Sequence, residues 1–348
     1  MVGGGDIQVI IFMSKINFIH KYEDIISVEN LLEAWKEFLT GKKSRIDVQE
    51  FQRHLMSNIF LLYRELKAKI YKHSDYKAFN ISDPKPRSIH KAKVRDRLLH
   101  HAIYRVLYPF FDKKFISDSF SCRVDKGTHK AIERFNVFAR KVSKNHHRIC
   151  WALKCDIRKF FASIDQKILL DILNKHISDT DLLWLLQNII ESFSSTQKGK
   201  GLPLGNLTSQ LLVNIYMNEF DQFVKHRLKV KCYIRYADDF VILSENKAWL
   251  ESVLLEIKHF LNDKLKLDLH PNKVFIKTVA SGVDFLGWVH FPYHRVLRTA
   301  TKRKMFRKLM NLNGDENNEK VLASYLGLLG HGDTFKLKRY LSLHFHLF

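Results

Sequence analysis

Apolar residues recur at helical spacing through the first part of the chain. Positions three and four residues apart are apolar over 28–39 and, for a longer stretch, over 48–70, so each run predicts a helix. The helical period returns over 95–110 and over 128–142. Between these runs, the segment 82–93 contains two prolines and four cations, and we expect it to be extended and positively charged.

The second part of the chain alternates between strand and helix patterns. It predicts, in order, a buried strand that ends at Asp156, a helix over 168–177, a glycine-rich loop that leads into a helix over 211–220, a hairpin over 232–243, a helix over 247–261, a strand over 273–279, a short strand pair around 285–291 and a helical tail from 298. Because one strand pair is a hairpin, we predict an α+β fold with a mixed, mainly antiparallel sheet rather than a doubly wound parallel sheet.

Composition adds size and charge to this picture. The chain has 348 residues, of which 46% are hydrophobic, so it can bury a large core in two or three domains. Lys and Arg number 58 against 36 Asp and Glu, which gives a net charge of +22, and 17 of the cations but only five of the acids lie over 85–148. This distribution favours a phosphate polymer as the partner, although scattered solvated lysines are the alternative.

The cysteines and the N-terminal segment bear on the cellular location of the protein. None of the four cysteines has Cys-x-x-Cys spacing, which argues against a disulfide framework or a zinc knuckle and predicts a cytoplasmic location. The apolar run over 7–13 is too short for a membrane span. We therefore expect residues 1–27 to be a leader or N-terminal extension, and we expect no membrane partner.

Two adjacent carboxylates, Asp238 and Asp239, lie at the tip of the predicted hairpin. A lone Asp-Asp pair is usually a solvated turn, but here both flanks are strands, and Asp156 ends a third strand. If these strands are neighbours, three mutually repelling acids converge and need a cation. Oxygen ligands favour Mg²⁺, with Mn²⁺ as a substitute, and two such ions about 3.5–4 Å apart are suited to phosphoryl transfer.

The motifs of the chain follow one another in a distinctive order. The series contains Asp156 with Phe161 five positions later, then a glycine-containing loop that leads into a helix, then Tyr-Ala-Asp-Asp, then a lysine, and last Phe-Leu-Gly-Trp. This set, over 85–288, resembles the ordered motifs of reverse transcriptases, which are RNA-directed DNA polymerases. The resemblance implies a right-hand polymerase fold, with N-terminal helices and fingers over 28–150, a palm over 151–294 that includes finger elements to about 205, and a small helical thumb over 295–348.

The resemblance also implies roles for single residues. Asp156, Asp238 and Asp239 correspond to the catalytic, metal-binding triad, joined by the backbone of Ile157, and Lys273 is a candidate general acid or else a solvated lysine. Phe161 corresponds to the gate that excludes a 2′-hydroxyl group, or else it is a core aromatic residue. The implied nucleotide-binding residues are Lys85, Arg87, Ile157, Phe161, Leu204, Gly205 and Gln210. The implied primer- and template-binding residues are Tyr236, Phe285, Leu286, Gly287 and Trp288.

Two further stretches, GLPLGNLTSQ and CRVDKGTHKA, resemble the reverse transcriptases of diversity-generating retroelements. Most members of the wider family have glutamine where this chain has Leu204, so we expect error-prone synthesis of cDNA, or else Leu204 is an ordinary packing residue. A phage-defence or compact intron-type bacterial enzyme is the nearest alternative, and a catalytically inactive nucleic-acid-binding scaffold is the alternative from another class. The expected partners are template RNA, primer and dNTPs, with an accessory protein or structured RNA as a further candidate.

Overall fold

The computed structural model describes residues 18–82, 86–310 and 317–344, and the chain divides into two compact units. Unit 1 consists of Met1–Lys113 and Gln166–Ser209, and unit 2 of Lys114–Asp165 and Gln210–Phe348. Lys85 and most of the expected leader lie outside the described residues. None of the described helices combines the length and the apolar composition that a bilayer-spanning helix needs.

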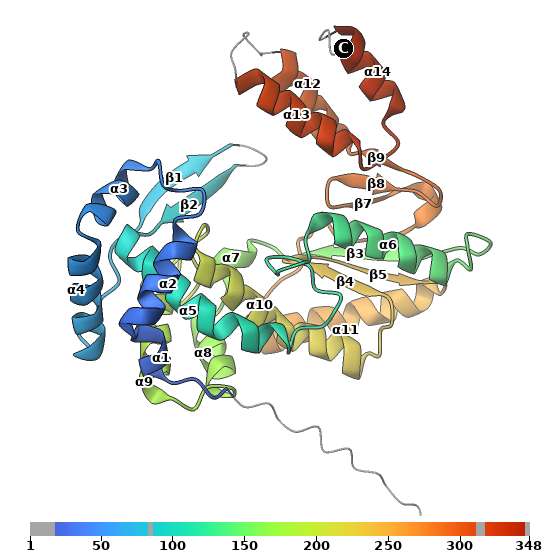
Figure 1. The fold of residues 1–348 in the computed structure, drawn as a ribbon. Helices are drawn as coiled ribbons and strands as arrows, with labels where there is room; N and C mark the ends of the chain where they lie inside the picture. The colour runs from blue at the N-terminus through green and yellow to red at the C-terminus, as the bar shows by residue number, and fades with distance from the viewer. Residues whose placement is uncertain (1–17, 83–85, 311–316, 345–348) are drawn as a thin grey trace, which may run out of the picture. The chain divides into compact units, whose positions relative to one another are not determined.

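Unit 1 is mainly helical (Figure 1). Its elements are α1 (Tyr22–Ile26), α2 (Val28–Phe38), α3 (Ile46–Arg53), α4 (Leu55–Lys67), β1 (Lys77–Ile81), β2 (Arg87–Lys91), α5 (Val94–Asp112), α8 (Gln166–Asn174) and α9 (Thr180–Glu191). The predicted helix over 28–39 is α2, which the Ser27 hydroxyl caps by accepting a hydrogen bond from the Asn30 amide at 3.1 Å. Buried Leu31, Trp35 and Phe38 lie on one face of this helix.

Three features of unit 1 differ from the sequence prediction or add to it. The single helix expected over 48–70 is wrong, because the backbone of His54 leaves the helical region (φ −120°, ψ 36°) and separates α3 from α4. The extended cationic segment forms strand β2, which pairs with the unpredicted β1 in an antiparallel hairpin. Helix α9 was not predicted either, although the Asp179 carboxylate caps it by accepting a hydrogen bond from the Leu182 amide at 2.8 Å.

Unit 2 contains two sheets and seven α-helices among the described residues. Its elements are α6 (Thr128–Val142), β3 (Trp151–Asp156), α7 (Phe160–Ser163), α10 (Leu207–Gln222, whose first turn belongs to unit 1), the π-helical turn η1 (Phe223–Arg227), β4 (Tyr233–Tyr236), β5 (Asp239–Ser244), α11 (Lys247–Leu265), β6 (Phe275–Thr278), the 3₁₀ turn η2 (Val279–Ser281), β7 (Val283–Phe285), β8 (Trp288–His290), β9 (Arg295–Leu297), α12 (Thr299–Met310), α13 (Asn317–Leu329) and α14 (Phe335–His344).

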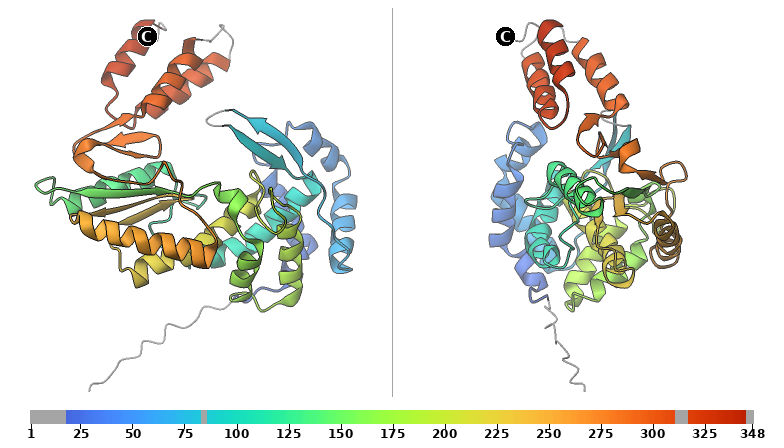
Figure 2. Two further views of the ribbon diagram at one scale, coloured as in Figure 1. Left: turned by 180° about the vertical axis from the view of Figure 1, so that it is seen from behind. Right: turned by 90° about the vertical axis from the view of Figure 1, so that its right-hand side faces the viewer.

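The central sheet of unit 2 has the strand order β4-β5-β3-β6, and every neighbouring pair is antiparallel. Helix α6 lies on one face of this sheet and α11 on the other (Figures 1 and 2). Side chains alternate between the two faces of a strand, and Ala152 and Val241 therefore pack with Phe135 of α6 in one core. On the other face, Leu250 and Ile257 of α11 are completely buried.

The second sheet, of order β7-β8-β9, joins the central sheet to the C-terminal helices. Phe285 of β7 belongs to the core beneath α6, whereas Trp288 of β8 packs with buried residues of α12, α13 and α14, among them Met305, Leu329 and Leu341. Half-buried Leu286, in the turn between these strands, packs against both cores. The mixed helices and antiparallel sheets confirm the predicted α+β class.

Candidate active site

Two of the three predicted acids lie directly opposite each other in the central sheet. The antiparallel register of β3 and β5 pairs Asp156 with Asp239, and residues paired in this way have Cβ atoms about 4.5–5.5 Å apart. Asp238 is the second residue of the two-residue turn between β4 and β5, and Asp239 is the first residue of β5. The Asp238 carbonyl accepts a hydrogen bond from the Ile157 amide at 3.1 Å. The structure therefore brings all three acids and Ile157 to the same edge of one sheet.

Each of the paired acids has its own lysine. Lys273 Nζ lies 2.9 Å from Asp156 Oδ1, and Lys154 Nζ lies 2.9 Å from Asp239 Oδ1. The two lysines differ in exposure, since 43% of the Lys273 side chain is exposed but only 7% of the Lys154 side chain. Burial raises the pKa of Asp239 to about 6, and the nearby Lys154 opposes this shift. Asp239 is therefore a buried acid whose ionised form depends on a neighbouring cation.

The donor set fits a hard divalent cation, because these acids offer only oxygen ligands and repel one another. Asp239 Oδ1 is buried beside Lys154 Nζ, at 2.9 Å, and accepts no other hydrogen bond from the described residues. An acceptor in this state gains from a cation. In the conformation described, however, no three acidic, His or Cys side chains among residues 18–82, 86–310 and 317–344 already surround one ion-sized position.

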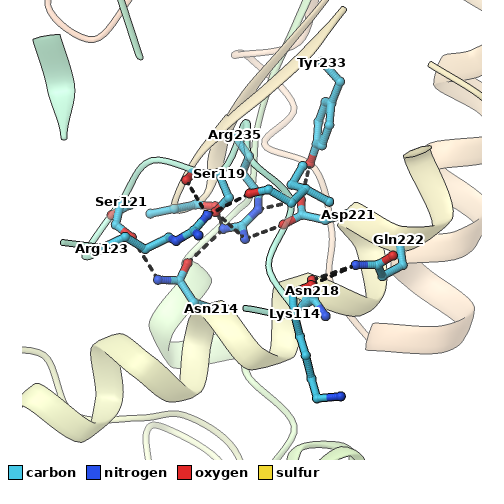
Figure 3. A network of polar contacts seen from close by, with 12 residues as sticks. Lys114, Ser119, Ser121, Arg123, Asn214, Asn218, Asp221, Gln222, Tyr233 and Arg235 are labelled. Atoms are coloured by element: carbon cyan, nitrogen blue, oxygen red, sulfur yellow. Dashed lines mark hydrogen bonds and ion pairs between the residues drawn. The ribbon is translucent and has the colours of Figure 1, made fainter. Parts of the chain in front are cut away.

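The buried guanidinium group of Arg235, a residue of β4, lies at the centre of a network of polar contacts (Figure 3). It donates to both carboxylate oxygens of Asp221 at 2.8 and 2.6 Å, to Asn214 Oδ1 at 3.2 Å, to the Ala237 carbonyl at 3.1 Å and to Ser119 Oγ at 3.1 Å. All five N–H donors of the side chain thus have acceptors, as a buried charge requires. Since Asn214 and Asp221 belong to α10, this network fastens the β4–β5 hairpin to that helix.

The hairpin turn contains a strained residue. Ala237 has φ of 56°, in the left-handed region where a side chain costs about 1–2 kcal/mol relative to glycine. Its carbonyl is one of the acceptors of Arg235, which holds the turn in this conformation. Tyr236, on the other side, is half-buried, and its hydroxyl accepts a hydrogen bond from Thr128 Oγ1 at 3.2 Å.

The short helix α7 carries two adjacent aromatic residues that differ in burial. Phe160 is buried, whereas Phe161 is half-buried, and their rings meet edge to face with centroids 5.5 Å apart. Lys159 begins the helix in the left-handed conformation (φ 47°) only three residues after Asp156. Phe160 is therefore the core aromatic residue of the pair, and Phe161 is the more accessible one.

The loop that carries Leu204 and Gly205 belongs to unit 1, where it is fastened to strand β2. The Leu204 carbonyl accepts a hydrogen bond from the His90 amide at 3.0 Å, and Asn206 Nδ2 donates to the His90 carbonyl at 3.0 Å. Gly205 has φ of +104°, and a Cβ atom there would lie 2.8 Å from Ile89 Cγ2. Glycine is therefore required both by the backbone conformation and by the close approach to β2.

The remaining predicted nucleotide contacts are divided between the units. Arg87 is exposed at the start of β2 in unit 1, whereas Gln210 is half-buried on α10 and is the first residue of the second segment of unit 2. Within unit 2 the structure brings together the three acids, Ile157 and Lys273. Within unit 1 it brings Leu204 and Gly205 against strand β2, which begins at Arg87.

The predicted primer-binding segment forms the tight turn between β7 and β8. Leu286 and Gly287 both have positive φ, at 51° and 86°, as in the turns that best match the twist of a two-residue hairpin. The side chains of Phe285 and Trp288 are buried in the two cores of unit 2. Only the backbone of the turn, with the half-buried Leu286 side chain, is available to a primer strand.

A family model described as reverse transcriptase (RNA-dependent DNA polymerase) matches residues 70–290, which is more than half of the chain. The chain belongs to the reverse transcriptase family. The matched range contains every predicted site residue, including the three acids and the turn between β7 and β8.

Several curated proteins are similar to this reverse transcriptase. Protein YkfC of Escherichia coli K12 is 26% identical over 287 residues, which cover 71% of this chain and 72% of YkfC. The group II intron-encoded protein LtrA of Lactococcus lactis is 24% identical over 290 residues, which cover 63% of this chain but 46% of LtrA. Among solved structures, telomerase of Candida albicans in complex with a fragment of telomeric RNA has a TM-score of 0.50 at 11% identity, covers 81% of this chain and 58% of its own, and supports the fold alone.

Sequence reasoning missed three polar residues of this reverse transcriptase that fix site elements in place. These are Lys154 beside Asp239, Arg235 beneath the hairpin turn and Asn206 in the loop on β2. Two of them carried a visible signal, because Lys154 and Arg235 are charged residues within apolar strand runs, where a charge is costly unless it is paired. Asn206 lies within the GLPLGNLTSQ stretch, but its hydrogen bond to His90 depends on a strand more than 100 residues away in the chain.

Proposed function

We propose that this chain is an RNA-directed DNA polymerase that extends a primer along an RNA template with dNTPs, and that it does so with frequent errors in a diversity-generating retroelement. The observation that supports the polymerase activity most directly is the register that pairs Asp156 with Asp239 beside the Asp238 turn. Membership of the reverse transcriptase family supports the choice of template and product. We expect the protein to act in the cytoplasm.

In this proposal Asp156, Asp238 and Asp239, with the backbone of Ile157, hold two Mg²⁺ ions or their Mn²⁺ substitutes. When bound, such ions activate the 3′-hydroxyl nucleophile and stabilise the developing charge on the leaving pyrophosphate. The chain contributes the placement of these acids, since the register of β3 and β5 fixes two of them and the Arg235 network fixes the turn that holds the third.

Two other side chains of unit 2 have proposed roles. Lys273, more than two-fifths exposed and 2.9 Å from Asp156, is mobile enough to donate a proton to pyrophosphate as it leaves. Half-buried Phe161 restricts the space beside the sugar and so favours dNTPs. In unit 1, exposed Arg87 attracts the triphosphate, and Lys85 is proposed to help it.

The error-prone character rests on Leu204. Its backbone is held to β2 by the His90 hydrogen bond, so its aliphatic side chain is presented at a fixed position. An aliphatic side chain offers no hydrogen bond to the incoming nucleotide or its base pair, and discrimination then depends on shape alone. We propose that this loss relaxes base selection.

A second candidate is a compact intron-type enzyme, which the similarity to group II intron-encoded LtrA favours. Nuclear intron maturase 4 of Arabidopsis thaliana, 28% identical over 131 residues that cover 36% of this chain and 16% of its own, points the same way. Sequencing the DNA that flanks the gene separates the two: a variable gene with a near-identical repeat supports the retroelement, and flanking intron RNA structure supports the alternative.

The polymerase activity is tested by primer extension with purified protein, primed RNA, dNTPs and Mg²⁺. Asp238→Asn is expected to lower extension by at least about 100-fold, because metal ions provide several kcal/mol of transition-state stabilisation. Asp263→Asn is the matched control, since this carboxylate is exposed on α11 and pairs only with His259 among the described residues. Full activity of Asp238→Asn would end the catalytic assignment and favour the inactive scaffold, provided that circular dichroism shows both variants folded.

A further inference from the structure

Lys154 lies inside the catalytic strand, two residues before Asp156. Side chains two residues apart on a strand share a face, so Lys154 and Asp156 both point to the α6 side of the sheet, where Ala152 and Val241 are completely buried. Only 7% of the Lys154 side chain is exposed. A buried ammonium group costs several kcal/mol unless a nearby charge compensates it, so the position demands a partner.

That partner is a catalytic acid. Lys154 is paired in register with Val241 of β5, and Asp239 lies two residues before Val241 on the same face. The lysine reaches diagonally to Asp239 Oδ1 at 2.9 Å. This contact is unlike the one between Lys273 and Asp156, because the Lys273 side chain is partly exposed to solvent, whereas Lys154 is enclosed by the core.

We propose that Lys154 is a positioning residue that acts as the built-in counter-ion of Asp239, holding this carboxylate in place and limiting how tightly the substrate-free site binds divalent cations. The proposal rests on the proposed function of the three acids. A fixed positive charge next to a carboxylate lowers the attraction of that carboxylate for a dication. Firm metal binding then requires additional negative charge, which the triphosphate of an incoming nucleotide supplies.

The test is Mn²⁺ binding to the substrate-free protein, measured by electron paramagnetic resonance and by thermal unfolding. Lys154→Met removes the charge and keeps a similar volume, and we expect it to bind Mn²⁺ at least about tenfold more tightly than the unchanged protein, with a larger rise in melting temperature on Mn²⁺ addition. Lys154→Arg keeps the charge and should leave the affinity within about twofold of the original.

Lys277→Met is the matched control for a general loss of charge, because Lys277 is exposed on β6 of the same sheet. If Lys154→Met folds only when Mn²⁺ is present, the metal has replaced the lysine and the proposal is supported. Equal or weaker Mn²⁺ affinity in Lys154→Met, instability that Mn²⁺ does not relieve, or no Mn²⁺ binding to any variant would overturn it. These measurements need no catalysis, so they are independent of the outcome for Asp238→Asn.

Discussion

The backbone around Leu204 is held in place by contacts that do not involve its side chain. Its carbonyl and the Asn206 amide group form two hydrogen bonds to His90, and Gly205 allows the loop to approach β2 closely. None of these contacts uses the Leu204 side chain. A substitution at this position is therefore expected to alter nucleotide selection without moving the loop.

Leu204→Gln is predicted to lower the misincorporation frequency by at least about threefold, because the glutamine amide restores a hydrogen-bonding check on the base pair. The measurement is deep sequencing of cDNA made on a defined RNA template. Leu207→Gln, half-buried three residues later at the start of α10, is the control and should leave the error spectrum as it is. An unchanged spectrum for Leu204→Gln would remove the fidelity argument.

The residues of the site were predictable from sequence to different extents. The acids were predictable because their motifs are specific and each lies at or next to the end of a strand. Only the structure, however, pairs Asp156 with Asp239. The role of Lys154 was not, because its burial depends on α6 and on a strand more than 80 residues away. For Phe285 and Trp288 the resemblance pointed to primer contact, but their side chains fill cores that form only in the folded chain.

Among the elements, the connection between α13 and α14 depends on a close approach. A Cβ atom on Gly332 would overlap the indole ring of Trp288 and would lie 2.9 Å from the Arg295 carbonyl. The Asp333 amide donates to that same carbonyl at 2.8 Å. The C-terminal helices therefore reach the β7–β9 sheet through a point that has no room for a side chain.

Gly332→Ala is predicted to destabilise this helical region by about 1–3 kcal/mol, the usual cost of overpacking a well-packed site. Urea unfolding followed by tryptophan fluorescence measures the change, and Trp288, at the contact, is one of the five tryptophans that contribute to the signal. Gly327→Ala is the matched control, because a Cβ atom at this position of α13 meets nothing within 4 Å and alanine favours a helix. Equal stability of the two variants would show that the contact is not a constraint.

Elements with strong local signals were the ones that sequence predicted. The helix α11 is an example, with apolar residues at regular spacing and the Asn246 side chain accepting a hydrogen bond from the Trp249 amide at 3.0 Å. The break at His54 was missed because apolar spacing continues through it, and the β1–β2 hairpin was missed because most of its side chains are exposed and show no alternation. The spacing of apolar residues predicts an element only where one of its faces is buried, and it gives no signal where most side chains are exposed.

Over the whole molecule, the excess of positive charge predicts how nucleic acid binds. The net charge of +22 is accompanied by an amphipathic α12, which buries Met305 and Leu309 and carries five cations between 302 and 308. We propose that this helix belongs to the thumb and follows the backbone of a template–primer duplex through charge rather than sequence.

The affinity for primed RNA is predicted to fall by at least about tenfold between 50 and 200 mM salt, through release of counterions. Replacing Lys302 and Arg303 together with glutamine should lower the slope of log affinity against log salt by up to about two. Lys36→Gln is the control, since Lys36 is exposed on α2 and pairs with Glu33. Fluorescence anisotropy over a salt series measures all three, and identical slopes would exclude α12 from the interface.

Because activity is expected to require the pairing of Asp156 with Asp239, the activity of a refolded sample should measure the fraction of molecules that folded correctly. The two strands are more than 80 residues apart in the chain, and a slip of one residue in their alignment would send one acid to the opposite side of the sheet. A molecule with this shifted register would have no enzymatic activity rather than a reduced activity. After dilution from denaturant, the recovered enzymatic activity should therefore be proportional to the number of molecules with the correct strand register. The activity should return with the slow, non-local pairing of these strands rather than with the fast recovery of the helical circular-dichroism signal.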